Sequence, residues 1–267
     1  MCGICGCGAA ADGEDHVHAD GTRHRHGHGG HSHDHDHDHV HGHGHGPHRV
    51  DLEARILAKN DELAARNRAW FAGRRILAIN LMSSPGAGKT SLLERMIRDW
   101  GRDLALSVLE GDQATALDRD RIRAAGAPAV QLSTGTGCHL DAEMVARGLR
   151  ELDPADGSVV LIENVGNLVC PALFDLGEHA KAVILSVTEG EDKPLKYPHM
   201  FAASSVMIVN KIDLLPHVDF DVARAVAFAR TVNPGIDMVE VSAKTGQGLD
   251  RWRHWLRHEA KAVHASP

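Results

Sequence analysis

The chain has 267 residues and a formal net charge of −7, with 29 Lys and Arg against 36 Asp and Glu. This acidic balance gives no electrostatic basis for a nucleic-acid partner. The apolar runs are far shorter than the roughly 18 residues that a membrane-spanning helix needs. The N-terminus lacks the charged and apolar regions of a signal peptide. We therefore expect a cytoplasmic protein that binds neither nucleic acid nor a membrane.

The first fifty residues differ in composition from the rest of the chain. Residues 1–8 contain three of the five cysteines, and residues 16–48 hold 14 of the 21 histidines, mixed with Gly and Asp. These residue types supply too little apolar area to offset the entropy of ordering such a segment. We predict that residues 1–50 are a disordered metal-binding extension and that residues 51–267 form one α/β domain with an N-terminal helix.

Beyond the extension, the amphipathic pattern of residues 51–72 predicts a helix that leads into the first strand. Strand-like runs then alternate with helix-like runs. The expected strands are 76–81, 104–109, 129–132, 159–162, 182–187, 206–209 and 238–241. Two expected helices follow the first two strands and end near residues 100 and 125. The other expected helices cover 140–152, 219–230 and 248–263. This alternation predicts an α/β fold with a mostly parallel sheet flanked by helices.

A glycine-rich turn follows the first expected strand and precedes a helical pattern. It reads Ser83-Ser84-Pro85-Gly86-Ala87-Gly88-Lys89-Thr90-Ser91. Strand, turn and helix in this order are typical of the P-loop of nucleotide-binding proteins, whose backbone N–H groups surround the β-phosphate. We expect Ser84 to Ser91 to bind the nucleotide, Lys89 to reach the β- and γ-phosphates, and the Thr90 hydroxyl to bind Mg²⁺. Ser83 stands in place of the first glycine of the general pattern.

Two later segments have the chemistry of guanine recognition. The sixth expected strand runs into Asn210-Lys211-Ile212-Asp213, and the seventh is followed by Ser242-Ala243-Lys244. The Asp213 carboxylate can accept hydrogen bonds from the N1–H and 2-amino groups of guanine, and adenine would leave it unpaired. With the P-loop upstream, these segments favour GTP over ATP as the ligand.

Two acidic segments at strand ends are candidates for a magnesium site. They are Glu110-Gly111-Asp112 and Glu163-Asn164-Val165-Gly166. Carboxylates there can bind Mg²⁺ directly or through water, and Gly166 can donate its N–H to the γ-phosphate. We assign catalysis to Lys89, Thr90, Asp112 and Glu163, and Mg²⁺ binding to Thr90, Asp112 and Glu163. The alternative is that Glu110 and Glu163 only cap loops. The sequence does not decide which of Glu110, Asp112 and Glu163 contacts Mg²⁺ directly.

The sequence has two groups of soft metal donors, one at the N-terminus and one inside the expected domain. They are Cys2, Cys5 and Cys7 in the first, and Cys138, His139 and Cys170 in the second. With the N-terminal amine, the first group suits Ni(II) or Cu(II) in a square-planar set and Zn(II) in a tetrahedral one. In the second group, Cys138 and His139 supply two ligands, and a third ligand has to come from Cys170 or from a second copy of the chain. Because Cys170 follows the Glu163–Gly166 loop closely, we expect metal affinity to depend on the nucleotide.

The histidine tract offers many imidazoles on a chain interrupted by Gly and Asp. Its densest part contains His31, His33, His35, His37 and His39. Such a tract is expected to bind several divalent ions at modest affinity, as a buffer rather than a defined site.

Together these motifs resemble the HypB family of hydrogenase nickel-incorporation GTPases. The resemblance covers the cysteine head, the histidine tract and residues 51–267, with Ser83–Thr90, Glu110–Asp112, Gly135–Asp141, Glu163–Pro171 and Asn210–Asp213 as its motifs. It implies a SIMIBI-type P-loop NTPase, GTP-dependent homodimerisation, a tight nickel site at the head and a weaker nickel or zinc site at the internal donors near the dimer interface. The implied partners are a HypA-type accessory protein and the precursor of the hydrogenase large subunit.

The predicted function is that of a GTP-hydrolysing nickel metallochaperone for [NiFe] hydrogenase, with metal release coupled to the nucleotide state. Three alternatives stay open. A urease-type accessory GTPase would usually carry Cys-Pro-His, whereas Cys138 and His139 are adjacent here. A metal-storage protein could carry a G domain that is vestigial, and so does not turn over nucleotide, or one that is uncoupled from metal binding. The third alternative is an ATP-using kinase, which would be excluded if guanine nucleotides alone stabilise the folded protein.

Overall fold

The computed structural model describes residues 16–17, 23–24, 47–112, 117–134 and 139–265. In the N-terminal fifty residues it describes one short antiparallel pair, β1 (His16–Val17) with β2 (Arg23–His24), and the first turn of a helix. The three head cysteines and the histidines from His31 to His39 lie outside the described residues, and so does Cys138.

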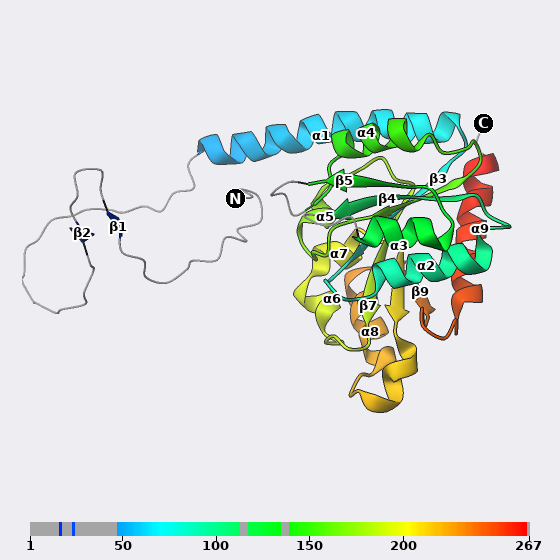
Figure 1. Ribbon diagram of the computed structural model, residues 1–267. Coiled ribbons are helices and arrows are strands. Elements are labelled where there is room, and N and C mark those ends of the chain that lie inside the picture. Colours follow the sequence, from blue (N-terminus) through cyan, green and yellow to red (C-terminus); the bar gives the residue numbers. More distant parts are fainter. Residues whose placement is uncertain (1–15, 18–22, 25–46, 113–116, 135–138, 266–267) are drawn as a thin grey trace, which may run out of the picture.

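A parallel sheet forms the centre of the domain. Its seven strands run in the order β5-β4-β6-β3-β7-β8-β9, and each neighbouring pair is parallel. The strands are β3 (Leu77–Ser83), β4 (Leu106–Asp112), β5 (Ala129–Ser133), β6 (Val159–Glu163), β7 (Ala180–Ser186), β8 (Val206–Asn210) and β9 (Asp237–Glu240). Parallel strands need crossover connections, and helices supply most of them here, so that both faces of the sheet are covered (Figure 1).

The longer helices are α1 (Pro47–Gly73), α2 (Lys89–Trp100), α3 (Leu117–Ala125), α4 (Ala142–Leu152), α8 (Val222–Val232) and α9 (Leu249–Ala265). The short ones are α5 (Cys170–Leu173), α6 (Lys193–Lys196), α7 (Pro198–Ala202) and the 3-10 helix η1 (Ile212–His217). The long helix α1 lies along α4 (Figure 1). None of the helices in the described ranges has the length and apolar character needed to span a membrane.

Successive side chains of β3 point to opposite faces of the sheet. Leu77, Ile79 and Leu81 belong to the core that α2, α3 and α9 cover. On the other face, Ala78 packs in the core beneath α1 and α4, and Met82 in the core beneath α7 and α8. Asn80 lies between these two on the same face and is fully buried, so a polar side chain separates the two apolar clusters there.

The predicted α/β class, with a parallel sheet flanked by helices, is confirmed, and each of the seven expected strands overlaps an observed one. The helix expected from residue 140 begins at Ala142, because Asp141 is its N-cap and accepts a hydrogen bond from Met144 N at 2.7 Å. The short helices α5, α6, α7 and η1 were not predicted, since a helix of one turn leaves no periodic pattern in a sequence.

Candidate nucleotide-binding and metal-binding site

The carboxyl ends of the central strands open into a cavity of about 480 Å³. Open parallel sheets bind ligands at this edge. The cavity is lined by Pro85, Gly86, Gly88, Lys89, Thr90, Ser91, Glu110, Gly111, Asp118, Arg121, Glu163, Asn164, Val165, Gly166 and Lys211. The structure therefore brings the predicted phosphate loop, both acidic segments and the Asn210–Asp213 segment to one place.

The phosphate loop has a backbone that requires glycine at two positions. Gly86 and Gly88 have φ angles of +74° and +97°. A Cβ atom on Gly88 would also lie 2.6 Å from Asn210 Nδ2. Gly88 is the N-cap of α2, which has no side-chain cap, and the first residues of α2 line the cavity. The N–H groups and dipole of such a helix N-terminus favour a bound phosphate.

Lys89 lies at the base of the cavity with its ammonium group largely buried. Its Nζ donates a hydrogen bond of 2.8 Å to Ser83 Oγ, so the serine that replaces the usual glycine holds the lysine. Burial lowers the pKa of Lys89, although nearby carboxylates, Glu163 first, oppose the shift. Ser84 is engaged differently, because its hydroxyl donates to Glu189 Oε2 at 2.6 Å.

Thr90 and Glu163 form the centre of the predicted magnesium site. Thr90 Oγ1 donates a 2.8 Å hydrogen bond to Glu163 Oε1, while Glu163 Oε2 is buried without a hydrogen-bond partner among the described residues. Burial raises the pKa of Glu163 to about 7, against the opposing effects of Lys89 and the Thr90 hydrogen bond. A hydroxyl beside a carboxylate with an unsatisfied buried oxygen fits a hard divalent cation.

The other two predicted carboxylates have different positions. Glu110 is buried in β4 and lines the cavity. Asp112 is the last residue of β4, paired in register with Ser133, and its side chain lies outside the described residues. Gly166 lies directly against the phosphate loop, since a Cβ atom there would be 3.0 Å from Pro85 Cα. The contact between its N–H and a γ-phosphate stays a prediction.

The predicted guanine-binding segments are hydrogen-bonded to the phosphate loop and to each other. Asn210 Nδ2 donates to Ala87 O at 2.9 Å, and Lys211 Nζ donates to Gly86 O at 2.7 Å. Asp213 Oδ1 accepts a 2.6 Å hydrogen bond from Ser242 Oγ. The segment that ends at Lys244 joins through its Ala243 amide, which donates to Asn210 Oδ1 at 3.3 Å. The structure therefore brings these segments together, and their contact with guanine stays a prediction.

Two residues of the cavity, Asp118 and Arg121 of α3, were not predicted. Arg121 donates hydrogen bonds to Glu94 and Asp118 and reaches Ser91 Oγ at 3.4 Å. The Glu94 carboxylate raises the pKa of the Arg121 guanidinium despite partial burial. The charged run Asp118–Arg121 is visible in the sequence, but such runs are more often solvated helix faces, so it carried no specific signal.

The internal metal donors lie on neighbouring segments, as far as the structure describes them. The half-buried His139 ring stacks on Phe174, with ring centroids 3.9 Å apart, and burial lowers the pKa of its imidazole. Cys170 is fully buried as the first residue of α5, and Asn167 Nδ2 lies 3.8 Å from its Sγ. Within the described residues, no three His, Cys, Asp or Glu side chains are grouped to hold a metal ion. An imidazole and a thiol on neighbouring segments still have the donor chemistry of a soft metal site.

Fold and site together define a nucleotide-binding protein of the P-loop class. The model of the CobW/HypB/UreG nucleotide-binding domain matches residues 77–240. Hydrogenase maturation factor HypB of Azotobacter vinelandii is 58% identical over 208 residues, which cover 78% of this chain and 69% of that protein. The chain belongs to the HypB family of hydrogenase maturation factors, which confirms the resemblance drawn from its motifs.

Two solved HypB structures are similar along nearly their whole length. The crystal structure of HypB from Archaeoglobus fulgidus has 39% identity and a TM-score of 0.71, covering 76% of this chain and 100% of that one. The crystal structure of HypB from Helicobacter pylori, in complex with nickel, has 36% identity and a TM-score of 0.72, covering 78% of this chain and 98% of that one.

Proposed function

We propose that this chain is a GTP-hydrolysing nickel metallochaperone, which stores nickel and delivers it for insertion into the [NiFe] hydrogenase large subunit. Release of the metal depends on the nucleotide state. One observation carries this proposal. A single short stretch contributes both Glu163, beside Thr90 in the nucleotide cavity, and Cys170, one residue of the predicted metal set.

The nucleotide half of the proposal follows from the hydrogen bonds of the cavity. Asp213, held by Ser242, recognises the N1–H and 2-amino groups of guanine. Lys89 and the amides at the start of α2 bind the phosphates, and Gly166 senses the γ-phosphate. Thr90 and Glu163, with Asp112 as the further predicted ligand, would hold Mg²⁺, which would supply positive charge beside the phosphates.

The metal half rests on donor chemistry and on similarity to a HypB crystallised with nickel. His139, with its lowered pKa, supplies a neutral imidazole at physiological pH. Cys138 and Cys170 supply thiolates, and the same set accepts zinc. The head cysteines and the histidine tract store nickel. We place the protein in the cytoplasm, where thiols stay reduced.

The proposed partners are a second copy of the chain, bound in the GTP state, a HypA-type accessory protein and the precursor of the hydrogenase large subunit. Two apolar side chains support a protein contact near the internal donors. Val169 and Leu173 flank Cys170 and are each 39% exposed. Apolar residues of this kind around a metal donor fit a surface that a partner covers during transfer.

Nickel binding tests the proposal when the internal site is isolated from the head. Replacing Cys2, Cys5 and Cys7 with serine in the full chain leaves Cys138 and Cys170 as the thiolate donors. Thiolate-to-nickel absorption and calorimetry, with GDP or a non-hydrolysable GTP analogue, then report the internal site alone. We expect an affinity that differs between the nucleotides and disappears with Cys138→Ala. Binding that ignores the nucleotide would favour the storage protein with an uncoupled G domain.

A further inference from the structure

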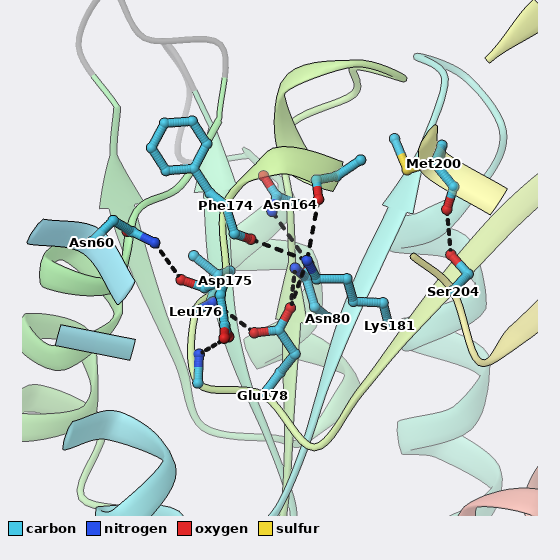
Figure 2. Close-up of polar contacts among 12 residues, drawn as sticks. Asn60, Asn80, Asn164, Phe174, Asp175, Leu176, Glu178, Lys181, Met200 and Ser204 are labelled. Atoms are coloured by element: carbon cyan, nitrogen blue, oxygen red, sulfur yellow. Dashed lines mark hydrogen bonds and ion pairs between the residues drawn. The ribbon is translucent and has the colours of Figure 1, made fainter. Parts of the chain in front are cut away.

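Asn80 is a polar residue at the centre of an apolar strand. It is fully buried in β3, where burial of an amide is costly unless its groups are hydrogen-bonded. Its Nδ2 donates to Glu178 Oε1 at 3.1 Å, and its Oδ1 accepts from Asn164 Nδ2 at 3.2 Å (Figure 2). Asn80 therefore joins two buried polar side chains from other segments.

On one side, Asn164 connects the nucleotide loop to the metal-donor segment. It directly follows Glu163, and its backbone N donates to Leu81 O at 3.0 Å. Its Oδ1 accepts from two backbone amides, those of Val165 at 3.0 Å and Leu140 at 3.3 Å. The second amide belongs to the peptide bond between His139 and Leu140. A displacement of the loop thus reaches the backbone of the histidine donor through one side chain.

On the other side, Glu178 and Lys181 connect Asn80 to α5. Glu178 Oε2 accepts from Leu176 N at 2.7 Å, and Glu178 Oε1 lies 3.6 Å from Lys181 Nζ. Lys181 Nζ donates to Ala172 O at 3.4 Å and to Phe174 O at 3.2 Å (Figure 2). The lysine thus holds the carbonyl end of the helix that begins with Cys170, next to the ring on which His139 stacks.

Stability alone gives little reason for this arrangement. Glu178 is 6% exposed, and burial raises the pKa of its carboxyl against the opposing effects of Lys181 and Asn80. Buried ion pairs and amides commonly contribute less to stability than apolar side chains of the same volume. Such a network fixes the positions of its side chains, because breaking one of its hydrogen bonds leaves several buried polar groups unsatisfied.

We propose that Asn164, Asn80, Glu178 and Lys181 form a positioning relay, which transmits the state of the Glu163–Gly166 loop to the donors His139 and Cys170. The relay deepens the proposed function and rests on it. When the loop adjusts to a γ-phosphate at Gly166, Asn164 shifts with it. Its hydrogen bonds to Leu140 and Asn80 then move the two donor segments together, which changes the geometry that the metal meets.

The test removes the far end of the relay, so that the nucleotide cavity stays intact. The double variant Glu178→Gln, Lys181→Met is made in the full chain that lacks the head cysteines. It keeps the buried volume and one of the two hydrogen bonds that Glu178 accepts, and it releases the carbonyls of Ala172 and Phe174. The measured quantity is the ratio of nickel affinities with a GTP analogue and with GDP, read from thiolate-to-nickel absorption in competition with a chelator.

The parent protein should show a ratio between about 5 and 150, the usual range of coupling between sites. In the double variant the ratio of affinities should fall to within about twofold of unity. The single variant Lys181→Arg keeps a cationic donor and should therefore keep most of the parent ratio. Ser204→Ala is the matched control, because its buried hydroxyl donates to Met200 O at 2.8 Å outside the relay (Figure 2). This control should keep the parent ratio.

Three outcomes would overturn the relay, and they are distinguishable. A folded double variant that keeps the parent ratio contradicts the relay and leaves the proposed function standing. A parent protein without any nucleotide dependence contradicts the coupling itself, and the relay with it. If the double variant does not fold, hydrogen exchange in the wild type tests the relay instead. The protection of residues 139–140 and 172–178 should differ between the two nucleotides. Equal protection would refute the relay.

Discussion

Thr90 Oγ1 donates a 2.8 Å hydrogen bond to Glu163 Oε1 and so joins the first turn of α2 to the end of β6. Both residues are buried at the carboxyl edge of the sheet. A neutral hydroxyl would rarely be aimed at a buried carboxylate for stability alone, because the second carboxylate oxygen is left unsatisfied. The pair is better explained as a prepared site for a divalent cation.

Thr90→Val removes the hydroxyl and keeps the shape of the side chain. We expect nucleotide binding to lose most of its dependence on Mg²⁺, with an affinity about 10- to 100-fold weaker at saturating Mg²⁺. Titration of a fluorescent GTP analogue with and without EDTA measures this. Thr231→Val, at an exposed position of α8, is the control and should bind as the wild type does. An unchanged Mg²⁺ dependence in Thr90→Val would exclude Thr90 as a ligand.

The raised pKa of Glu163 predicts a pH dependence of stability in protein free of metal and nucleotide. The carboxyl titrates near pH 4.5 in the unfolded chain and near 7 in the folded one. Between these values the folded state holds a proton that the unfolded state has lost, so stability falls as the pH rises through this window. Glu163→Gln removes the effect and should stabilise the protein by on the order of 3 kcal/mol at about pH 8, with little change near pH 4.5.

Thermal and denaturant unfolding in EDTA at several pH values checks this prediction. Glu62→Gln, at an exposed position of α1, serves as the matched control, and its effect on stability should stay within about 0.5 kcal/mol. A Glu163→Gln variant whose stability difference from the wild type is the same at all pH values would show that Glu163 titrates normally.

Asp213→Asn tests base recognition. The amide presents a donor where the carboxylate presents an acceptor, so it mismatches the 2-amino group of guanine and matches the 2-oxo group of xanthine. We expect GTP affinity to fall about 100-fold or more while xanthosine triphosphate gains affinity. Competition binding with both nucleotides measures this change in base preference. The control is Asp219→Asn, at an exposed position. If both variants keep the preference of the wild type, Asp213 does not read the base.

Asn67 of α1 tests how firmly the N-terminal helix holds the metal-donor segments. Its Nδ2 donates to Ala142 O at 2.8 Å and to Leu176 O at 3.0 Å. Asn67→Ala leaves both buried carbonyls without this donor, and we expect a loss of about 2–4 kcal/mol in the free energy of unfolding. Urea unfolding measures it, with the exposed Arg66→Ala as the control. Equal stability of the two variants would mean that α1 does not hold these segments.

Much of the fold was predictable because its signals are local. Strand-like apolar runs alternate with helical periodicity, and the glycines of the phosphate loop have backbone angles that favour glycine. The N-cap Asp141 was also visible in the sequence, but helix patterns locate boundaries only to within a few residues. The one-turn helix α5 was not predictable, since its position depends on carbonyl contacts with Lys181 from a later strand.

The candidate site was predictable where a motif carries the chemistry, as at Lys89, Thr90 and Asp213. It was not predictable where residues meet only through the fold. Asn80 gave a faint signal, a polar residue in an apolar strand, but its partner Glu178 lies far away in the sequence. Arg121 also gave no specific signal, because an arginine on an amphipathic helix is usually solvated.

The central claim is that nucleotide turnover controls the internal metal site, and a single-turnover experiment tests it most directly. Protein lacking the head cysteines is loaded with nickel and GTP, and the thiolate-to-nickel absorption is recorded together with phosphate release after Mg²⁺ is added. We predict that the absorption changes at the same rate as phosphate is released, and that Cys138→Ala shows no such change. Absorption that stays constant through complete hydrolysis would contradict the claim.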